Sequence, residues 1–480
     1  MAKLDDLRTK IDLIDKELMQ LIDQRFNITK EIGLLKKELN LEVTNNTRED
    51  IVLSNANQFV YSNEIKFLYK EMFNLNKVYQ GFNYGLIAGD ISYTLSPLVY
   101  SFMGLNDYRL IQTDDFNKTI KKLVFKGVNV TNPFKIDAYN YCDELDESAS
   151  ITKAVNLIID KKGYNTDYLA LKEIFNKYKL KNKKVLIIGN GATSKSVLLA
   201  LDNLATVLVR NIRDSKEDLI SNYDKYLDYQ YIINTTPYGI KPKYESIPLF
   251  SLEKFTNLEM VIDVIYNPLN SPLIIEAKRY GIKNINGLEL LVSQAAINYN
   301  LWFNKKINKN QILNKLNHHL YNIVLIGMSF SGKTTLGSKL SKDLRKEFID
   351  IDNELGKENL SLSEVLKTGD LKTYRMHEEK CTIKYAHRFN QVISTGGGII
   401  LNENAMQHLK LNSIIVYLET SLETIKQRMD NSRPLLQSFE DLNRMFSDRI
   451  DKYEKYSMIK LHENMKYEEI LVKINEAISY

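Results

Sequence analysis

One stretch of the chain carries a complete phosphate-binding sequence. Residues 327–334, GMSFSGKT, match G-x-x-x-x-G-K-[ST] and stand between the apolar run NIVLI and a helical pattern, which is the context that the motif requires. Backbone N–H groups of such a loop cradle phosphate oxygens, the lysine reaches the β- and γ-phosphates, and the threonine hydroxyl coordinates Mg²⁺. The motif predicts a site for ATP and Mg²⁺ whose nucleotide ligands are Gly327, Gly332, Lys333, Thr334 and Thr335.

One residue of this loop is unusual. Phe330 occupies a place where a further glycine is frequent, and a bulky side chain tolerates a positive φ poorly. We therefore expect the loop to follow a different path at Phe330.

A second glycine turn follows another buried strand. Residues 183–194, KKVLIIGNGATS, read as a strand, a G-x-G turn and a helix, which aims backbone N–H groups at a pyrophosphate. A lone G-x-G is equally typical of an ordinary strand–helix turn. The next strand, TVLVRNIRD, has arginines where a ribose 2′-hydroxyl would need an acidic residue, which favours NADP over NAD. The candidate cofactor ligands are Gly189, Gly191, Ala192, Arg210, Asn211 and Arg213.

Cations on a predicted helix form the third candidate set. The apolar residues of the first 40 positions recur by threes and fours, and Arg25 interrupts one apolar row. A cation in such a row needs an anion, or else it sets helix register or extends to solvent. Lys36 lies roughly 16 Å along the helix from Arg25 and about 20° around it, so both can face one pocket. Arg8, roughly 25 Å away in the other direction, could reach that pocket only from a second, antiparallel copy.

The composition of the chain limits the kind of protein that can position these residues. The 480 residues, 44% apolar and 10% aromatic, predict about three packed units. The 65 Lys+Arg and 60 Asp+Glu residues are interspersed, which argues against nucleic acid as a partner. We expect no membrane contact and a cytoplasmic protein, because there is no signal core and no apolar run of about 18 residues. Cys142 and Cys381 lie far apart in no metal-ligand spacing, which suits a reducing compartment.

The elements change type along the chain. Residues 1–80 lack proline and predict an all-α domain. From about residue 84, short β-branched runs alternate with helical stretches and predict a βαβ domain with a parallel sheet. The polar stretch at 304–319 predicts a linker, and a further α/β domain begins at about residue 320.

Residues 1–80 resemble the all-helical chorismate mutase family over essentially their whole length. The resemblance rests on the spacing of Arg8, Arg25, Lys36, Arg48, Glu49 and Gln80. It implies rearrangement of chorismate to prephenate without a cofactor. Arginines would bind the two carboxylates of the substrate, and Lys36 and Gln80 would donate hydrogen bonds to its ether oxygen. On the family pattern Arg8 comes from the partner of a homodimer. Asn45 and Asn76 stand where many members carry Asp and Ser, which bears on the rate.

Six separated motifs of the middle segment follow one family order. VNVTNPFK, AVNLII, YNTD, INTTPYG, YNPLNSP and GLELLVSQAA resemble shikimate dehydrogenase over about 83–303, with a Rossmann NADP-binding part at about 180–265. The resemblance implies that Lys135 and Asp167 exchange a proton with the oxygen at C3 while hydride moves from the nicotinamide, although such a pair could also be a plain salt bridge. The implied substrate ligands are Thr94, Ser96, Thr131, Asn156, Tyr266 and Gln294.

The carboxylate-binding loop departs from the dehydrogenase pattern. GDISYTLSP lacks a proline that the family usually has, and Thr94 replaces its first serine. A threonine hydroxyl donates the same hydrogen bond, but its methyl group restricts the rotamer. We expect an altered affinity for the carboxylate, and quinate stays open as a secondary substrate.

Five motifs behind the phosphate loop identify an acceptor. FIDID, TYRMHEE, STGGGII, NSRPLL and RIDKY resemble shikimate kinase over about 320–480. The resemblance implies that Asp352 holds the acceptor hydroxyl as candidate base and that Asp350, with Thr334, supports Mg²⁺. Taken singly, Asp-x-Asp pairs and arginines are common on solvated surfaces.

The same resemblance supplies the remaining kinase ligands. Arg375 and Arg449 would clamp the substrate carboxylate, and Glu378 would orient Arg375. Gly397 would present its backbone N–H to the substrate. Arg433, on a mobile lid, would meet the transferring phosphoryl group.

The sequence as a whole predicts a multifunctional enzyme. It would reduce 3-dehydroshikimate with NADPH, phosphorylate shikimate at the 3-hydroxyl with ATP and Mg²⁺, and rearrange chorismate to prephenate. The predicted domains are 1–80, 83–303 and 320–480 with a linker at 304–319, and the helical domain predicts a homodimer. In one alternative, residues 1–80 are a dimerisation or effector-binding module without turnover. In another, the dehydrogenase-like part is a cofactor-binding scaffold without activity.

Overall fold

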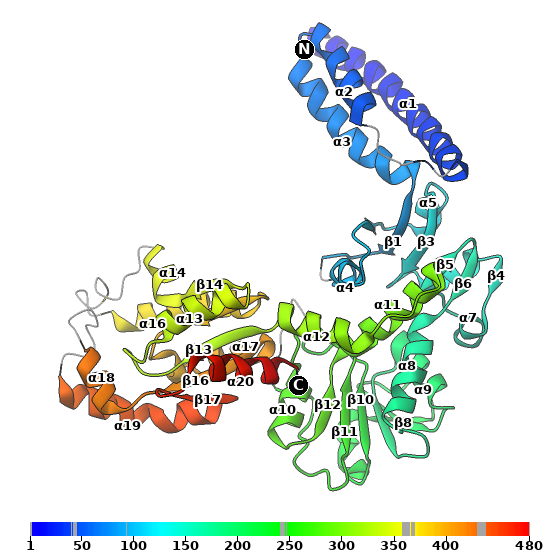
Figure 1. Cartoon of the computed structure of the whole chain (residues 1–480). Helices are drawn as coiled ribbons and strands as arrows, with labels where there is room; N and C mark the ends of the chain where they lie inside the picture. Colours follow the sequence, from blue (N-terminus) through cyan, green and yellow to red (C-terminus); the bar gives the residue numbers. More distant parts are fainter. Residues whose placement is uncertain are drawn as a thin grey trace. The chain divides into compact units, whose positions relative to one another are not determined.

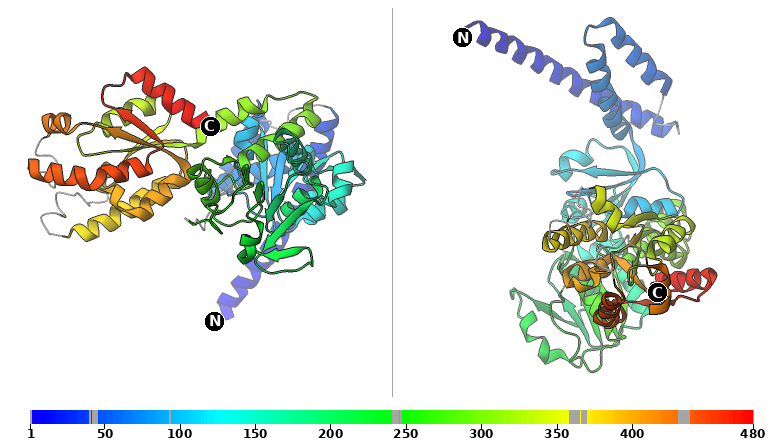
Figure 2. Two further views of the ribbon diagram at one scale, coloured as in Figure 1. Left: turned by 90° about the horizontal axis from the view of Figure 1, so that it is seen from below. Right: turned by 90° about the vertical axis from the view of Figure 1, so that its left-hand side faces the viewer.

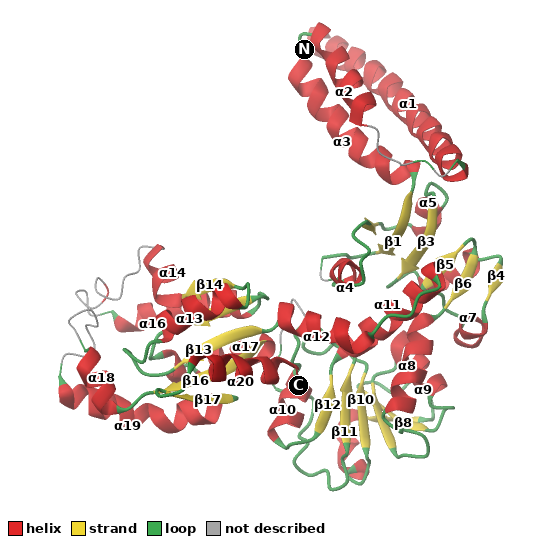
Figure 3. Cartoon of the chain, viewed as in Figure 1, coloured by secondary structure: helices red, strands yellow, loops and turns green. Residues whose placement is uncertain are grey.

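The computed structural model describes most of the chain. It covers residues 2–39, 41, 46–92, 94–240, 245, 247–357, 365, 370–429 and 438–479, and the side chains of residues 2, 37, 46 and 78–80 lie outside it. The chain forms two compact units, Met1–Ala170 with Ile297–Ile307 and Leu171–Ala296 with Asn308–Tyr480. A helical segment is followed by sheets flanked by helices (Figure 3), which confirms the predicted fold class.

The N-terminal segment is all-helical (Figure 1). Its elements are α1 (Ala2–Glu38), α2 (Asn46–Asn55), the 3₁₀ turn η1 (Ala56–Gln58) and α3 (Ser62–Gln80). The C-terminal half of α1 packs against α3, whereas its N-terminal end extends past α2 and α3 (Figure 2). The predicted apolar row is present but not covered, because Leu4, Ile11 and Leu18 are 53%, 56% and 51% exposed. The described part of the chain therefore leaves this face of α1 without a partner.

A mixed sheet forms the next lobe of the first unit, in the order β2-β1-β3-β5-β6-β4. Its strands are β1 (Phe82–Ala88), β2 (Tyr108–Gln112), β3 (Phe125–Val130), β4 (Glu144–Leu145), β5 (Leu157–Ile159) and β6 (Lys162–Tyr164). Its helices are α4 (Ser96–Phe102), α5 (Phe116–Ile120), α6 (Lys135–Tyr141) and α7 (Glu147–Thr152). We call this part the substrate lobe.

The expectation of a parallel sheet is wrong for part of this lobe. β1 pairs in parallel with β2 and β3, but β5 is antiparallel to both β3 and β6. For β5 and β6, the physical reason is the two-residue turn between them, where Asp160 and Lys161 both have positive φ, 45° and 62°. Two residues suffice for a hairpin but not for a parallel crossover.

A fully parallel sheet forms the cofactor lobe, in the order β12-β11-β10-β7-β8-β9. Its strands are β7 (Val185–Ile188), β8 (Ala205–Val209), β9 (Glu217–Leu219), β10 (Tyr231–Asn234), β11 (Met260–Asp263) and β12 (Lys283–Ile285). The helical elements are α8 (Thr166–Lys177), α9 (Ala192–Ala200), η2 (Ile220–Tyr226), α10 (Pro272–Arg279) and α11 (Gly287–Phe303). The central strands β7, β10 and β11 are entirely buried, as a parallel sheet covered on both faces requires. The sheet extends to residue 285, beyond the 180–265 expected.

A second parallel sheet, in the order β14-β15-β13-β16-β17, forms the C-terminal domain. Its strands are β13 (Asn322–Ile326), β14 (Glu347–Asp350), β15 (Gln391–Ser394), β16 (Ser413–Glu419) and β17 (Ile459–His462). The helical elements are α12 (Lys309–Leu320), α13 (Lys333–Asp343), α14 (Ile351–Lys357), α16 (Leu371–Ala386), η3 (Ile399–Leu401), α17 (Glu403–Asn412), α18 (Leu422–Arg428), α19 (Phe439–Tyr456) and α20 (Tyr467–Ser479). The stretch expected as a linker contains α12, whose Ile312, Leu316 and Leu320 are buried.

Candidate active sites

Arg25 on α1 faces two aromatic rings of α3. Its guanidinium carbon lies 5.8 Å from the ring centre of Tyr69 and 5.7 Å from that of Phe73. One of its terminal nitrogens is buried and has no hydrogen-bond partner among the described residues. Burial lowers the pKa of Arg25, but a guanidinium stays charged at neutral pH. The anion expected beside Arg25 is thus replaced by aromatic faces, and the buried nitrogen is left to bind an anion from solution.

The other helical candidates are only partly gathered. Glu49 of α2 forms a 3.0 Å ion pair with Lys77 of α3, and each side chain is about a quarter exposed. Lys36 is half-buried near the end of α1, and Arg48 is exposed on α2. Arg8 lies on the exposed part of α1, where it pairs with Asp5 at 3.5 Å.

Asn76 of α3 is buried and accepts a hydrogen bond from Thr29 of α1 at 3.3 Å, which ties α3 to α1. Gln80 ends α3, but its side chain lies outside the described part of the chain. Asn45 is likewise outside the described residues.

In the substrate lobe, three predicted ligands follow two neighbouring strands. Thr94 and Ser96 follow β1, and their hydroxyls are hydrogen-bonded at 3.1 Å. The N–H of Ser96 also donates to the Thr94 hydroxyl at 3.2 Å, so this threonine organises the start of α4. Thr131 directly follows β3. Because β1 and β3 are adjacent and parallel, these residues share one edge of the sheet.

Lys135 and Asp167 meet in the same lobe. Lys135 begins α6 and Asp167 lies in the first turn of α8. The distance from Lys135 Nζ to Asp167 Oδ2 is 2.6 Å, and each side chain is 25% exposed. The pair is therefore close and reachable from solvent, as a pair that exchanges protons with a bound molecule must be.

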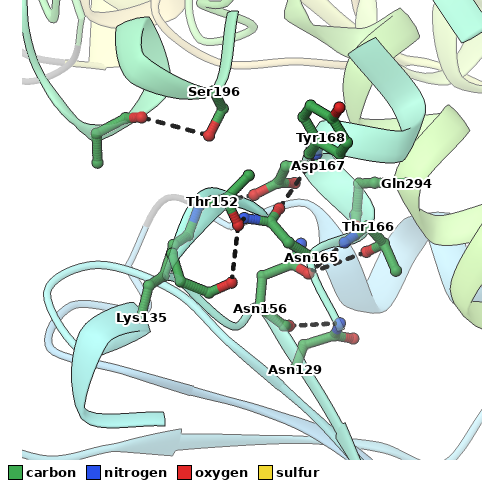
Figure 4. Close-up of polar contacts among 12 residues, drawn as sticks. Asn129, Lys135, Thr152, Asn156, Asn165, Thr166, Asp167, Tyr168, Ser196 and Gln294 are labelled. Atoms are coloured by element: carbon green, nitrogen blue, oxygen red, sulfur yellow. Dashed lines mark hydrogen bonds and ion pairs between the residues drawn. The ribbon is translucent and has the colours of Figure 1, made fainter. Parts of the chain in front are cut away.

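Buried asparagines fix the position of Asp167 (Figure 4). The side-chain oxygen of Asn156 accepts hydrogen bonds from the N–H of Thr166 at 2.7 Å and from its hydroxyl at 3.1 Å. Asn165 accepts from the N–H of Tyr168 at 3.1 Å. Asn156 was predicted to bind the substrate, but its side-chain oxygen accepts hydrogen bonds from the start of α8. The positioning role of Asn165 was missed, although it belongs to the YNTD motif.

A cavity of about 600 Å³ in the cofactor lobe brings together the second glycine turn and the arginines after β8. Its lining includes the predicted Gly189, Gly191, Arg210, Asn211 and Arg213. Gly189 has φ 106°, and a Cβ there would lie 2.9 Å from the Thr235 hydroxyl. Nothing lies within 4 Å of the corresponding position at Gly191, so the backbone is open to close approach. Ala192, predicted with this set, begins α9.

The residues of this cavity fit NADP. Its glycine turn leads into the N-terminus of a helix, which suits a pyrophosphate, and its arginines suit a 2′-phosphate. The segment Thr235–Gly239 after β10 also lines the cavity, and only the INTTPYG motif signalled it.

Glu217 on β9 is a residue of this site that sequence reasoning missed. Its carboxylate accepts hydrogen bonds from the backbone of Arg213 at 2.7 Å and Asp214 at 3.2 Å, and from Asn190 Nδ2 at 3.1 Å. These hydrogen bonds, led by that of Arg213, lower the pKa of Glu217. Glu217 therefore joins the arginine segment to the glycine turn.

Two further predicted ligands belong to the second unit, whereas Lys135 belongs to the first. Tyr266 is half-buried in the segment after β11. Gln294 on α11 is 9% exposed and donates to the carbonyl of Leu291 at 3.1 Å.

A second cavity, of about 680 Å³, surrounds the phosphate loop. Its lining includes the predicted Gly332, Lys333, Thr334, Thr335, Asp350, Asp352 and Gly397. Lys333 Nζ donates to the carbonyls of Gly327 at 3.0 Å and Met328 at 2.8 Å. The Thr334 hydroxyl donates to Asp350 Oδ2 at 2.7 Å, which places two hard oxygen ligands side by side. This donor set fits Mg²⁺, which takes few protein ligands beside phosphates and water.

Phe330 adopts the left-handed conformation, with φ 63°. Phe330 therefore does not avoid a positive φ, contrary to the expectation from its side chain. The conformation costs roughly 1–2 kcal/mol for a residue with a Cβ. The Phe330 side chain packs against the buried core of this domain, and that contact offsets the cost.

Several predicted ligands contact the glycine run after β15. Arg375 forms an ion pair with the buried Glu378, whose pKa is raised by burial. Arg449 donates to the carbonyl of Gly397 at 2.9 Å. A Cβ on Gly396 would lie 3.1 Å from Asp352 Oδ1. Both arginines, the glycine run and Asp352 thus converge at one place.

The hydroxyl of Tyr453 on α19 donates a hydrogen bond to the Gly397 carbonyl at 2.7 Å, a contact that the sequence did not indicate. Arg433 lies outside the described residues.

Replacing Gly398 by alanine should weaken shikimate binding. The new Cβ would lie 2.5 Å from Arg375 Nη1, so the guanidinium would have to leave its pair with Glu378. We expect the KM for shikimate to rise about tenfold or more, which corresponds to roughly 1.4 kcal/mol, while the KM for ATP stays unchanged. Gly356→Ala is the matched control, because nothing lies within 4 Å of its Cβ position. Equal KM values for Gly398→Ala and the wild type would contradict the assigned packing.

Comparison with known proteins gives three family matches along the chain. The chorismate mutase type II model matches residues 7–81, the shikimate dehydrogenase substrate binding domain residues 86–158, and shikimate kinase residues 330–479. Within the described ranges, no helix is suited to span a membrane, and no group of three or more His, Cys, Asp or Glu could hold a metal ion.

Individual relatives resemble the middle of the chain. A shikimate dehydrogenase (NADP(+)) of Methanococcus vannielii is 32% identical over 274 residues, covering 48% of this chain and 96% of that protein. One of Saccharolobus islandicus is 33% identical over 259 residues, covering 48% and 93%. The crystal structure of a chorismate mutase/shikimate 5-dehydrogenase fusion protein from Clostridium acetobutylicum is 26% identical and covers 49% of this chain and 97% of that chain, with a TM-score of 0.45.

A parallel cofactor lobe and a mixed-sheet substrate lobe are both typical of an α/β oxidoreductase, and the chain belongs to the shikimate dehydrogenase family. With its two other domains, it is a multifunctional enzyme of the shikimate pathway that carries chorismate mutase, NADP-dependent shikimate dehydrogenase and shikimate kinase domains. NADP and ATP are its implied cofactors, and Mg²⁺ is the typical ion of the kinase reaction. Its partners are small-molecule substrates.

Proposed function

We propose that Lys135 and Asp167 are the proton-transferring pair of the dehydrogenase. The 2.6 Å contact between them, at the edge shared by the Thr94, Ser96 and Thr131 segments, carries this assignment. Bound NADPH supplies the hydride for C3. The Lys135 ammonium donates a proton to the C3 oxygen, and Asp167 holds the ammonium in place. Thr94 and Ser96 bind the carboxylate.

The other ligands divide between substrate and cofactor. Thr131, Asn156, Tyr266 and Gln294 bind the ring oxygens of dehydroshikimate. The cofactor ligands are Gly189, Gly191, Ala192, Arg210, Asn211 and Arg213. The arginine pair supports the preference for NADP.

For the kinase, we propose Asp352 as the base that accepts the proton of the shikimate 3-hydroxyl. Its support is the convergence of Asp352 with the Arg375–Glu378 pair on the glycine run. Arg375 and Arg449 hold the carboxylate, and Gly397 contacts the substrate through its backbone.

The nucleotide side of the kinase follows from the phosphate loop. Gly327, Gly332, Lys333, Thr334 and Thr335 hold the phosphates. Thr334 and Asp350 support Mg²⁺, whose charge would counter that of the phosphates when it is bound. Arg433 meets the transferring phosphoryl group.

For the mutase, we propose a homodimer in which Arg8 of one copy completes the site of the other. Two observations support it: the apolar row of α1 is exposed, and Arg8 lies on the far part of the helix from Arg25. Arg25, Lys36, Arg48, Glu49 and Gln80 supply the remaining cage. A dimerisation module without turnover is less well supported, because a buried Arg25 nitrogen that has no partner within the described part of the chain suits an anion site.

We propose domains at 1–80, 83–303 and 320–480, and the segment 304–319, which contains most of α12, lies between the last two. We propose a cytoplasmic location, which is supported by the wide separation of Cys142 and Cys381 in the sequence.

The consecutive reactions are tested in one tube. Full-length protein given dehydroshikimate, NADPH, ATP and Mg²⁺ should yield shikimate 3-phosphate, identified by mass. Asp352→Asn should stop at shikimate, because loss of a positioned base slows phosphoryl acceptance about 10²–10⁴-fold. Glu354→Gln, two residues further along α14, is the matched control and should still form the phosphate. Phosphate formation by Asp352→Asn at the wild-type rate would contradict the role of Asp352.

A further inference from the structure

The segment between β11 and α10 is anchored to the cofactor lobe at both of its ends. It comprises residues 264–271, which we call the 264–271 loop, and it carries Tyr266. Asp263, the last residue of β11, is fully buried. Its carboxylate accepts hydrogen bonds from the N–H of Ile265 at 3.0 Å and from the hydroxyl of Ser271 at 2.5 Å. One buried carboxylate thus closes the loop on itself.

The middle of the same loop is hydrogen-bonded to the kinase domain. The N–H of Leu269 donates to Asn412 Oδ1 at 2.9 Å, and the N–H of Asn270 donates to the carbonyl of Leu411 at 2.8 Å. Asn270 Nδ2 donates to the carbonyl of Lys410 at 2.9 Å. Leu269 and Asn412 are fully buried and Asn270 is 2% exposed. Because water cannot replace these bonds, a lost partner would leave an unsatisfied buried group and free the loop to shift.

A tyrosine at the end of α12 completes the contact. The hydroxyl of Tyr321 donates to Asn270 Oδ1 at 3.0 Å, and Lys278 Nζ donates to the same oxygen at 2.8 Å. Every side-chain atom of Asn270 that can form a hydrogen bond therefore has a partner. We call Leu269, Asn270, Tyr321 and Asn412 the loop–kinase junction.

The junction lies at the edge of the kinase sheet opposite to the phosphate site. Tyr321 directly precedes β13 and Asn412 directly precedes β16, whereas the phosphate loop follows the carboxyl end of β13. Five residues of β-strand separate these two ends by about 17 Å. On the other side of the junction, the 264–271 loop follows the carboxyl end of β11, which is the edge where open α/β sheets bind ligands. The junction thus links the back of the kinase to the ligand-binding edge of the cofactor lobe.

We propose that Asn412 and Tyr321, although they belong to the kinase domain, are positioning residues of the dehydrogenase. They hold the 264–271 loop so that Tyr266 meets dehydroshikimate, and the inference rests on the substrate role proposed for Tyr266. The relative from Methanococcus vannielii is matched over 96% of its length by only 48% of this chain. The junction also needs the kinase domain, so it is a property of the fused protein.

Substitution on the kinase side tests the inference in the full-length protein. Asn412→Ala removes the acceptor of the Leu269 N–H and should raise the KM for dehydroshikimate about fivefold or more, with kcat and the KM for NADPH within about twofold. The KM values of the kinase for shikimate and ATP should stay within about twofold, because its site lies at the other edge of the sheet. Asn402→Ala, at the opposite end of α17, is the matched control and should leave the dehydrogenase unchanged.

The outcomes separate the junction from the role of Tyr266. Tyr266→Phe with a wild-type KM for dehydroshikimate would contradict the substrate role of Tyr266. A raised KM in Tyr266→Phe together with a wild-type KM in Asn412→Ala would overturn the junction. Should Asn412→Ala fail to fold, Tyr321→Phe decides, because it removes only the hydroxyl and keeps the ring in place. We expect it to raise the KM for dehydroshikimate about fourfold at an unchanged melting temperature, and a KM within about twofold of the wild type would overturn the proposal.

Discussion

Lys135→Ala should lower the rate of dehydroshikimate reduction by about 10²–10⁴-fold, the range that a positioned general acid contributes. The ammonium lies 2.6 Å from Asp167, and truncation leaves no group at that place to give a proton to the C3 oxygen. Loss of absorbance at the NADPH band on addition of dehydroshikimate measures the rate. Shikimate phosphorylation and chorismate rearrangement in the same protein should continue at wild-type rates.

A second lysine of the substrate lobe provides the control. Lys161 also forms an ion pair with an aspartate, Asp143 at 3.1 Å, but its side chain is 56% exposed. Exposed pairs of this kind contribute about 0–1 kcal/mol, so Lys161→Ala should leave the reduction rate within about twofold. If Lys135→Ala retained wild-type turnover, the pair would be a plain salt bridge and the proton would have to come from elsewhere.

Motifs that are local in sequence could be predicted directly. The phosphate loop and the second glycine turn each lie within a dozen residues, and the strand before and the helix after each of them fix their geometry. Both turns line cavities with most of the residues that the motifs named, Gly327 and Ala192 being the exceptions. The hairpin between β5 and β6 escaped prediction, because its turn residues Asp160 and Lys161 are not the glycine or asparagine that signal such a turn.

Features made by partners distant in sequence could not be predicted. Asn270 is an ordinary polar residue of the YNPLNSP motif, and its contact Lys410 lies 140 residues away. Glu217 acts through backbone N–H groups, which every sequence has. Arg25 looked like a cation in need of an anion, but its neighbours are the rings of Tyr69 and Phe73 on another helix. In each case the residue type was visible, and the fold decided what it contacts.

Arg25→Ala should abolish chorismate rearrangement, by about 10²–10³-fold, because the buried nitrogen is a preorganised donor for a substrate anion. The dimer should persist, since truncation at Arg25 leaves the exposed apolar row of α1 intact. Arg8→Ala should cause a similar loss if that side chain enters the site of the other copy. Lys10→Ala is the matched control, because Lys10 lies two residues after Arg8 on α1 and forms only a surface pair with Asp6 among the ion pairs of the described residues. This variant should retain full turnover.

Mixing the two inactive variants gives the sharpest result. After dissociation and reassociation, half of the dimers would carry one Arg8→Ala chain and one Arg25→Ala chain. One of the two sites in each such dimer would combine the intact Arg25 of the first chain with the intact Arg8 of the second. Prephenate formation should therefore recover to about a quarter of the wild-type rate, as expected when a two-fold symmetric dimer shares residues across its interface. A mixture as inactive as its components would show that Arg8 and Arg25 do not act across copies, and a monomer in solution would remove the shared site altogether.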